Sequence, residues 1–114
     1  MNIGITGATG FLGDYLINYF SKSKEYNIYG LSREKDRASN KRINWIIGDL
    51  SSGNVCKKLI DVSDVILHLA HNNSPINSNQ NYFEDCQINL IPSLKLLEEI
   101  RKSNKKVHLI FASS

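Results

Sequence analysis

Cysteine and long apolar runs are scarce in this sequence. Its two cysteines, Cys56 and Cys86, lie on separate predicted helices and match no metal-binding or redox spacing. We therefore expect both to be free thiols in a reducing compartment, and we expect no metal site. No apolar run is long enough to cross a membrane, and no basic leader precedes an apolar stretch at the N-terminus. These absences predict a cytoplasmic protein that has no membrane contact.

Clustered positive charge is also lacking. The net charge of +3 is distributed over short pairs such as Lys41-Arg42, Lys57-Lys58 and Lys105-Lys106. No aromatic side chains are interleaved with these basic residues, which favours a solvated surface over a nucleic-acid interface. The 114 residues contain no internal repeat and match the size of one domain. We expect a single domain over residues 1–114 and no nucleic-acid partner.

Apolar residues follow a strand period in five segments and a helical period in three. Strands are predicted over Asn2–Thr6, Asn27–Ser32, Ile43–Ile47, Val65–Ala70 and Val107–Ala112. Helices are predicted from Phe11 to about Lys22, from a cap at Ser51 or Ser52 to about Ile60, and from about Tyr82 to Ser103. This order predicts an α/β fold with a doubly wound parallel sheet of strand order 3-2-1-4-5, because right-handed crossovers connect the strands.

Two of the helices carry an apolar stripe. In the first helix the apolar residues, which we expect on the side facing the sheet, are Phe11, Leu12, Tyr15, Leu16, Tyr19 and Phe20. In the last helix the predicted stripe is Ile88, Ile91, Leu94, Leu97 and Ile100. Pro92 interrupts this pattern and should kink the last helix or divide it in two.

A glycine-rich turn joins the first strand to the first helix. Gly7, Gly10 and Gly13 are spaced Gly-x-x-Gly-x-x-Gly, and they leave the backbone free to turn tightly and to approach a ligand. The following helix would point its free amides and its positive dipole end at that ligand, which is how proteins hold a pyrophosphate. The alternative is an ordinary strand-to-helix turn of another α/β protein.

This spacing differs from the general Gly-x-Gly-x-x-Gly dinucleotide motif and resembles that of the extended short-chain dehydrogenases/reductases, the NAD(P)-dependent epimerase/dehydratase family. The resemblance implies a Rossmann-like fold and a nicotinamide cofactor. The residues of the turn and of the helix start that it assigns to cofactor binding are Gly7, Thr9, Gly10, Phe11, Leu12 and Gly13.

The end of the second strand carries the residues that should choose between NAD and NADP. An acidic residue in this region normally binds the adenosine ribose of NAD, whereas this chain has Ser32 and Arg33. A hydroxyl and a guanidinium suit a 2′-phosphate, so we favour NADP over NAD. Glu34 and Asp36 keep NAD binding open, and Arg33 can also be read as a solvated loop residue.

Three further matches follow the order of the resembled family. Asp49 and Leu50, just after the third strand, correspond to residues that contact adenine, although Asp49 could equally cap the next helix. The segment His68-Leu69-Ala70-His71 resembles His-x-Ala-Ala, in which the strand end lines the nicotinamide side of the cofactor path; it departs from that pattern at His71. We interpret His68 as a packed core histidine, and Leu69, Ala70 and His71 as cofactor contacts. Asn89 begins a pattern that ends at Leu96-Leu97, where its family role is structural.

The last residues, Ser113 and Ser114, match the hydroxyl pair that ends the fifth strand in this family. The resemblance makes Ser114 the catalytic hydroxyl that bonds the substrate oxygen undergoing redox. The alternative is a generic strand end.

The proton-transferring pair of the family is missing. That base is a tyrosine whose phenol pKa is lowered by a lysine four residues on, and none of the five tyrosines here has such a lysine. We therefore expect the N-terminal portion of a family member, ending before the Tyr-Lys helix. The resemblance implies that the intact protein acts on a nucleotide-diphosphate sugar, and it is compatible with a homodimer of the intact protein. A non-catalytic NADP-binding or sensing module, and an inactive truncated fragment, remain as alternatives.

Overall fold

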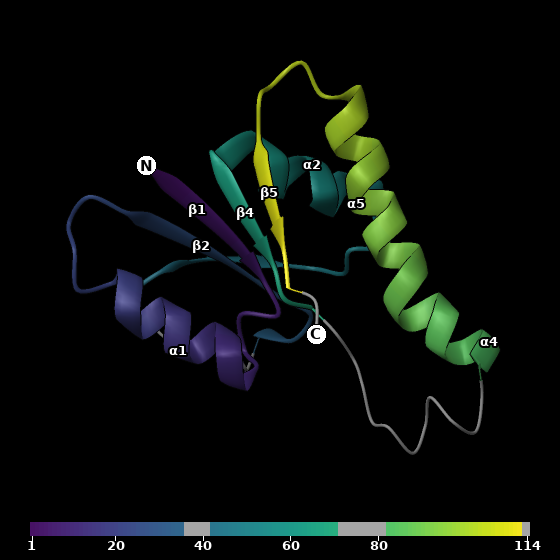
Figure 1. The fold of residues 1–114 in the computed structure, drawn as a ribbon, viewed down its shortest axis with the longest axis horizontal. Coiled ribbons are helices and arrows are strands. Elements are labelled where there is room, and N and C mark those ends of the chain that lie inside the picture. Colours follow the sequence, from purple (N-terminus) through teal and green to yellow (C-terminus); the bar gives the residue numbers. More distant parts are fainter. Residues whose placement is uncertain (36–41, 71–81, 113–114) are drawn as a thin grey trace.

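A five-stranded parallel sheet forms the centre of the molecule (Figure 1). The computed structural model describes residues 1–35, 42–70 and 82–112. The strands are β1 (Asn2–Thr6), β2 (Asn27–Ser32), β3 (Asn44–Ile47), β4 (Val65–His68) and β5 (His108–Phe111). Their order in the sheet is β3-β2-β1-β4-β5, and all four neighbouring pairs are parallel. The predicted fold class and strand order are therefore confirmed.

Helices connect the strands. They are α1 (Phe11–Phe20), α2 (Gly53–Val62), α4 (Tyr82–Asp85), the π-helix η2 (Cys86–Leu90) and α5 (Ile91–Lys102). The last three, α4, η2 and α5, follow one another directly from Tyr82 to Lys102 (Figure 1). The irregularity predicted at Pro92 takes the form of the π-helix, which ends just before the proline at the start of α5. Proline supplies no N–H to the preceding turn, so a change of helical hydrogen bonding is expected there.

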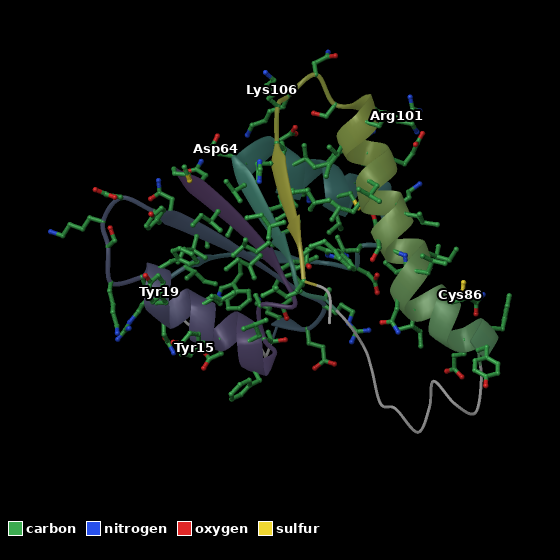
Figure 2. The ribbon with its side chains drawn as sticks, viewed as in Figure 1. Tyr15, Tyr19, Asp64, Cys86, Arg101 and Lys106 are labelled. Carbon is green, nitrogen blue, oxygen red and sulfur yellow. The ribbon has the colours of Figure 1, made fainter. Side chains whose placement is uncertain are left out.

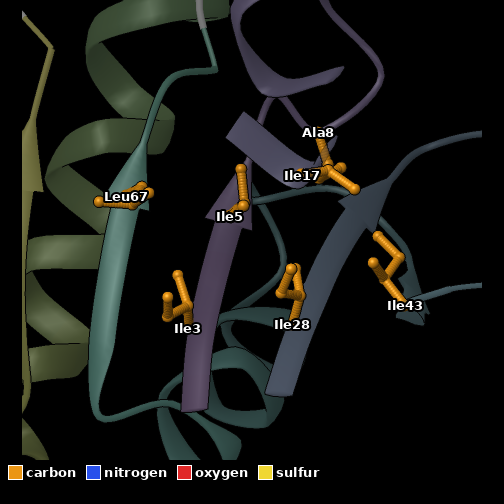
Figure 3. Close-up of a cluster of buried hydrophobic side chains, with 7 residues drawn as sticks. All are labelled: Ile3, Ile5, Ala8, Ile17, Ile28, Ile43 and Leu67. Atoms are coloured by element: carbon orange, nitrogen blue, oxygen red, sulfur yellow. The ribbon is translucent and has the colours of Figure 1, made fainter. Parts of the chain in front are cut away.

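Two apolar clusters cover the two faces of the sheet. On one face Ile17 of α1 packs with side chains from β1, β2, β4, the glycine turn and the residue before β3 (Figure 3): Ile3, Ile5, Ile28, Leu67, Ala8 and Ile43. On the other face α2 and α5 contribute to a second cluster: Leu31, Leu50, Cys56, Leu59, Ile60, Ile66 and Leu96. The neighbours Ile66 and Leu67 of β4 serve opposite clusters because successive side chains of a strand alternate. The sheet is doubly wound as predicted.

The buried face of α1 differs from the predicted one. Tyr15 and Tyr19, labelled in Figure 2, are 63% and 61% exposed, and Phe11 is 93% exposed. The residues of α1 that are buried are Gly13 and Ile17. Because Gly13 has no side chain, α1 lies close to the glycine turn, and this contact selects the stripe that includes Ile17. Two members of the predicted stripe, Leu16 and Phe20, are half-buried and pack against the first cluster, so the assignment to the sheet side is confirmed for them. It was wrong for the exposed members Phe11, Leu12, Tyr15 and Tyr19.

The predicted stripe of the last helix is mostly not the buried one. Its members Ile88, Ile91, Leu94 and Leu97 are 37% to 49% exposed, and only Ile100 among the five packs against the second cluster. The buried residues of α5 are instead Leu96 and Glu99. This side of α5 packs against α2, so the neighbouring helix, and not the apolar period, decides which face is buried.

Candidate functional site

The carboxyl ends of β1 and β4 meet at the centre of one edge of the sheet. β1 pairs with β2 on one side and with β4 on the other, so the chain leaves β1 at the point where the strand order reverses. Thr6 of β1 lies opposite His68 of β4. In open α/β sheets the crevice outside such a switch point is where ligands bind. The glycine turn and the Leu69-Ala70 segment both begin there.

The fold requires glycine at position 7, whether or not a ligand binds. Its φ of 69° lies in the left-handed region, which side chains rarely adopt. A Cβ at this position would lie 2.8 Å from the Ala70 nitrogen and 2.8 Å from the Leu69 carbonyl carbon. The turn therefore passes against the end of β4 with backbone against backbone.

Gly13 and Gly10 differ in how much space surrounds them. A Cβ on Gly13 would collide with the Gly7 carbonyl oxygen and would lie 2.8 Å from the Ala8 Cα. Within the described part of the chain, a Cβ on Gly10 would meet the Gly7 oxygen alone, at 3.3 Å, and Gly10 has an extended backbone with φ −81° and ψ 176°. Packing explains the glycine at position 13, whereas a Cβ at position 10 would require the Gly7 oxygen to shift by only a few tenths of an ångström.

The N-terminal end of α1 offers backbone donors. The Asp14 amide is bonded to the Gly10 carbonyl at 2.9 Å, so the amides of Phe11, Leu12 and Gly13 come before the first i→i−4 bond of the helix. Among residues 1–35, 42–70 and 82–112, no side-chain hydrogen bond caps this end of α1. Uncapped amides together with the positive end of the helix dipole suit an anionic group.

Thr6 fixes the end of β4, a role that sequence reasoning missed. Its Oγ1 accepts hydrogen bonds from the Leu69 and Ala70 amides, each at 3.0 Å, and lies 2.6 Å from His68 Nδ1. His68 is 3% exposed, which confirms its interpretation as a packed core histidine. His68 Nε2 lies 2.8 Å from Ser93 Oγ, and Ser93 was not a sequence candidate. Thr6 could have been identified from the sequence, because it is a single hydroxyl residue in an otherwise apolar strand. The sequence around Ser93 contains no feature that points to its role.

Ser32 and Arg33 have different surroundings at the end of β2. Ser32 is 4% exposed, its hydroxyl donates to the Glu34 carbonyl at 2.7 Å, and it accepts from the Glu34 amide at 3.2 Å. The single hydroxyl hydrogen of Ser32 is thus used within its own turn. Arg33 is exposed, so of the two residues Arg33 is the one that can donate to a phosphate.

Asp49 and Leu50 follow β3 and are positioned by local bonds. The Gly48 amide donates to the Ser32 carbonyl at 2.9 Å, which holds this segment beside the end of β2. Asp49 is exposed, and its Oδ1 accepts from the Ser51 amide at 2.9 Å. Leu50 is 5% exposed and belongs to the cluster beneath α2. Asp49 can therefore face a ligand, while its neighbour's side chain already serves the core.

Three sequence candidates lie outside the described residues: His71, Ser113 and Ser114. β5, which leads to the two serines, runs beside β4, and the Ala112 amide donates to the His68 carbonyl at 3.4 Å. Asp36, kept as a possible ribose contact, is also outside these residues.

Cys56 and Cys86 are free in the structure, Cys56 buried and Cys86 half-buried, as predicted. Burial raises the pKa of the Cys56 thiol to about 11, so this thiol is protonated at neutral pH. Among residues 1–35, 42–70 and 82–112, no group of three or more His, Cys, Asp and Glu residues is arranged to hold a metal ion. Within the same ranges no helix has both the length and the apolarity needed to cross a membrane.

Comparison with protein families gives one match over nearly the whole chain. Residues 3–114 match the model of the NAD dependent epimerase/dehydratase family. An uncharacterised UDP-glucose epimerase of Bacillus subtilis is 28% identical over 127 aligned residues, which cover 100% of this chain and 40% of that protein. The CDP-paratose 2-epimerase of Salmonella typhi is 27% identical over 125 residues, covering 100% of this chain and 37% of that enzyme.

Solved structures share the fold. The UDP-glucose 4-epimerase of Thermotoga maritima, solved with UDP-glucose, superposes with a TM-score of 0.84 at 23% identity, over 100% of this chain and 38% of that one. The UDP-glucuronic acid 4-epimerase of Bacillus cereus, solved with UDP-glucuronic acid and NAD, gives a TM-score of 0.83 at 24% identity, over 100% and 40%. The chain thus spans about two fifths of the length of these proteins.

Proposed function

The chain belongs to the NAD dependent epimerase/dehydratase family, and from that premise we propose that it is the NAD(P)-binding portion of an enzyme acting on a nucleotide-diphosphate sugar. One observation carries this proposal: the N-terminal end of α1, which no described side chain caps, opens at the switch point of the sheet beside Gly10, the least crowded glycine of the turn. The names of two relatives, a UDP-glucose epimerase and a CDP-paratose 2-epimerase, support the class of substrate.

The amides of Phe11, Leu12 and Gly13 would bind the cofactor pyrophosphate, with Thr9 at the exposed side of the turn. The room above Gly10 would let the pyrophosphate approach the backbone closely. Leu69 and Ala70 would line the nicotinamide side of the crevice. In this arrangement the two central strands hold the middle and the reactive end of the cofactor.

The adenosine end would be held at the ends of β2 and β3. Asp49 would accept a hydrogen bond from the adenine amine, and its exposure supports this role. The buried Leu50 side chain would contribute only at the edge of the ring. We propose a preference for NADP because the exposed Arg33 can donate to a 2′-phosphate in the geometry that a guanidinium favours.

Hydride transfer to or from a sugar carbon would be the chemistry that the bound cofactor supplies. Ser114 and His71 enter this proposal through the family resemblance alone. Ser114 would bond the reacting oxygen, and a tyrosine beyond these 114 residues would move the proton, because no tyrosine here is followed by lysine at the fourth position. A non-catalytic NADP-binding module is the second candidate, because cofactor binding by the glycine turn does not need a tyrosine-lysine pair.

Titration calorimetry with NADPH and with NADH tests cofactor binding directly. We expect saturable binding of both, tighter for NADPH, and a higher melting temperature, since ligand at 100 times its dissociation constant stabilises by about 2.7 kcal/mol. Binding of neither nucleotide would overturn the proposed function. Equal affinities, or a preference for NADH, would overturn the assignment of Arg33 alone.

Turnover separates the two candidate functions once binding is established. The polypeptide encoded by the full reading frame is used, because the proposal places the proton-transferring tyrosine beyond Ser114. It would be incubated with UDP-glucose or CDP-linked sugars and NADP⁺ or NAD⁺, the oxidised forms that can take hydride from these sugars, and in parallel with NADPH. The nucleotide sugars are then analysed by chromatography. Epimerised, dehydrated or reduced sugar supports the enzyme. Cofactor binding with no product in any of these mixtures supports the binding module.

A further inference from the structure

A chain of buried and half-buried polar contacts links β1 to the start of α5 through His68. It runs from Thr6 Oγ1 to His68 Nδ1 at 2.6 Å and from His68 Nε2 to Ser93 Oγ at 2.8 Å. It ends with the Ser93 hydroxyl donating to the Asn89 carbonyl of η2 at 2.9 Å. Thr6 is 0% and His68 3% exposed, so the bonds between them are shielded from water and their geometry is fixed by the fold.

The direction of the first bond follows from the acceptor capacity of Thr6. A hydroxyl has two lone pairs and one hydrogen. Both lone pairs of Thr6 Oγ1 are occupied by the Leu69 and Ala70 amides, each at 3.0 Å. The Thr6 hydrogen must therefore be donated to His68 Nδ1, which makes that ring nitrogen an acceptor.

The second bond agrees with the first. Because Ser93 donates its only hydrogen to the Asn89 carbonyl, Ser93 Oγ accepts from His68 Nε2. We infer that His68 is a positioning residue, held as the neutral tautomer with its proton on Nε2, that orients the Thr6 hydroxyl toward the ring and so keeps both Thr6 lone pairs on the Leu69 and Ala70 amides. A protonated ring would direct an N–H at an oxygen that has no lone pair left.

The position of the Leu69-Ala70 backbone matters because it lies against the glycine turn. A Cβ on Gly7 would be 2.8 Å from the Ala70 nitrogen, so these two segments fix each other's place at the switch point. The Phe111 ring of β5 also packs on His68, with ring centroids 5.5 Å apart. Through these contacts His68 connects the ends of β1 and β4 to α5. The link from this positioning to cofactor affinity rests on the proposed function.

The tautomer is measured without any ligand. In 15N-labelled protein at neutral pH, long-range 1H–15N correlation spectra distinguish protonated from unprotonated ring nitrogens. We expect His68 to show a protonated Nε2 and an unprotonated Nδ1, with no averaging. His108, which is exposed on β5, provides a ring in solvent as a reference within the same spectrum. Its signals and those of His71 are assigned with the variants His108→Gln and His71→Gln. A proton on Nδ1, or a doubly protonated ring, would overturn the inference.

Two substitutions at Ser93 separate positioning from simple packing. Ser93→Ala removes the acceptor for Nε2 and should shift the Nε2 and Hε2 resonances of His68, while Nδ1 stays unprotonated because Thr6 still donates to it. Ser93→Thr keeps the hydroxyl and should restore the wild-type spectrum. If the proposed function holds, Ser93→Ala should also weaken NADPH binding about fivefold, the effect of one lost neutral hydrogen bond. An unchanged His68 spectrum in Ser93→Ala contradicts the inference. Failure of wild-type protein to bind NADPH contradicts only the proposed function and leaves the spectral result standing.

Discussion

The ends of β1 and β4 and the ends of β2 and β3 lie at the same edge of the sheet but are built in different ways. At the first pair, bonds join residues 62 to 64 positions apart and lie in the interior, as between Thr6 and the segment His68 to Ala70. At the second pair, side-chain bonds span two positions, from Ser32 to Glu34 and from Asp49 to Ser51.

This difference indicates how the two halves of the site would respond to change. Where positions far apart in sequence fix the backbone, a substitution alters folding and binding together. Where local turns present exposed side chains such as Arg33, a substitution can alter ligand preference with little effect on folding. We therefore expect substitutions at the ends of β1 and β4 to change stability more than substitutions at the ends of β2 and β3.

The largest effect is expected for Thr6→Val, which retains the shape of the side chain but removes the hydroxyl. The Ala70 amide and His68 Nδ1 lose their partner, whereas the Leu69 amide keeps its bond to the Thr6 carbonyl at 3.2 Å. We therefore expect the free energy of unfolding to fall by roughly 4 kcal/mol, at about 1–3 kcal/mol for each of the two unpaired groups. Urea denaturation followed by circular dichroism measures the change. Thr6→Ser keeps the hydroxyl and serves as the control; equal stability of the two variants would show that the bonds contribute little.

Gly13→Ala should rank next. Its new Cβ would meet backbone atoms of Gly7 and Ala8, which cannot move without displacing the turn. Such overpacking costs about 3 kcal/mol, although alanine is the better helix former. The same denaturation experiment applies, with Gly10→Ala as the matched control at the start of the same helix. A Gly13→Ala variant as stable as Gly10→Ala contradicts the close contact between α1 and the turn.

Gly10→Ala tests the glycine of the turn that has the least crowded surroundings. We expect the free energy of unfolding to change by less than about 1 kcal/mol, because alanine is a poorer N-cap but also restricts the unfolded chain. The added methyl group would stand where the pyrophosphate approaches, so NADPH affinity should fall about thirtyfold, or about 2 kcal/mol. Calorimetry gives both affinities. Gly53→Ala, at the start of α2, controls for a general effect of removing a helix-start glycine.

The smallest and most selective effect is expected for Arg33→Ala. Loss of the guanidinium should weaken NADPH binding about tenfold, or about 1.4 kcal/mol, and leave NADH affinity unchanged. The free energy of unfolding should stay within about 0.5 kcal/mol, as for most exposed sites. Lys35→Ala removes the same charge two positions away and should affect neither cofactor in this way. Equal losses for NADPH and NADH would indicate general electrostatic attraction.

Much of the fold could be predicted from local patterns. The bounds of β1 and β2 agree residue for residue with the predicted strands, because each apolar run is ended by glycine or polar residues. The order of strands and helices then restricts the topology, since parallel strands need right-handed crossovers. The glycine turn was identifiable because its spacing falls between a strand and a helix. These features depend on residues that are neighbours in sequence.

Contacts between distant residues decided the rest. Tyr15 and Ile17 both fit an apolar face of α1, and only the approach of Gly13 to the turn buries Ile17 and exposes Tyr15. Ser32 fits a phosphate site as well as Arg33 does until the Glu34 carbonyl takes its hydrogen. The sequence alone determined the order of strand, glycine turn and helix, an arrangement that suits an anion. Only the tertiary structure showed that Thr6, His68 and Ser93 hold that turn in place, because their bonds exist only once β1, β4 and α5 have packed together.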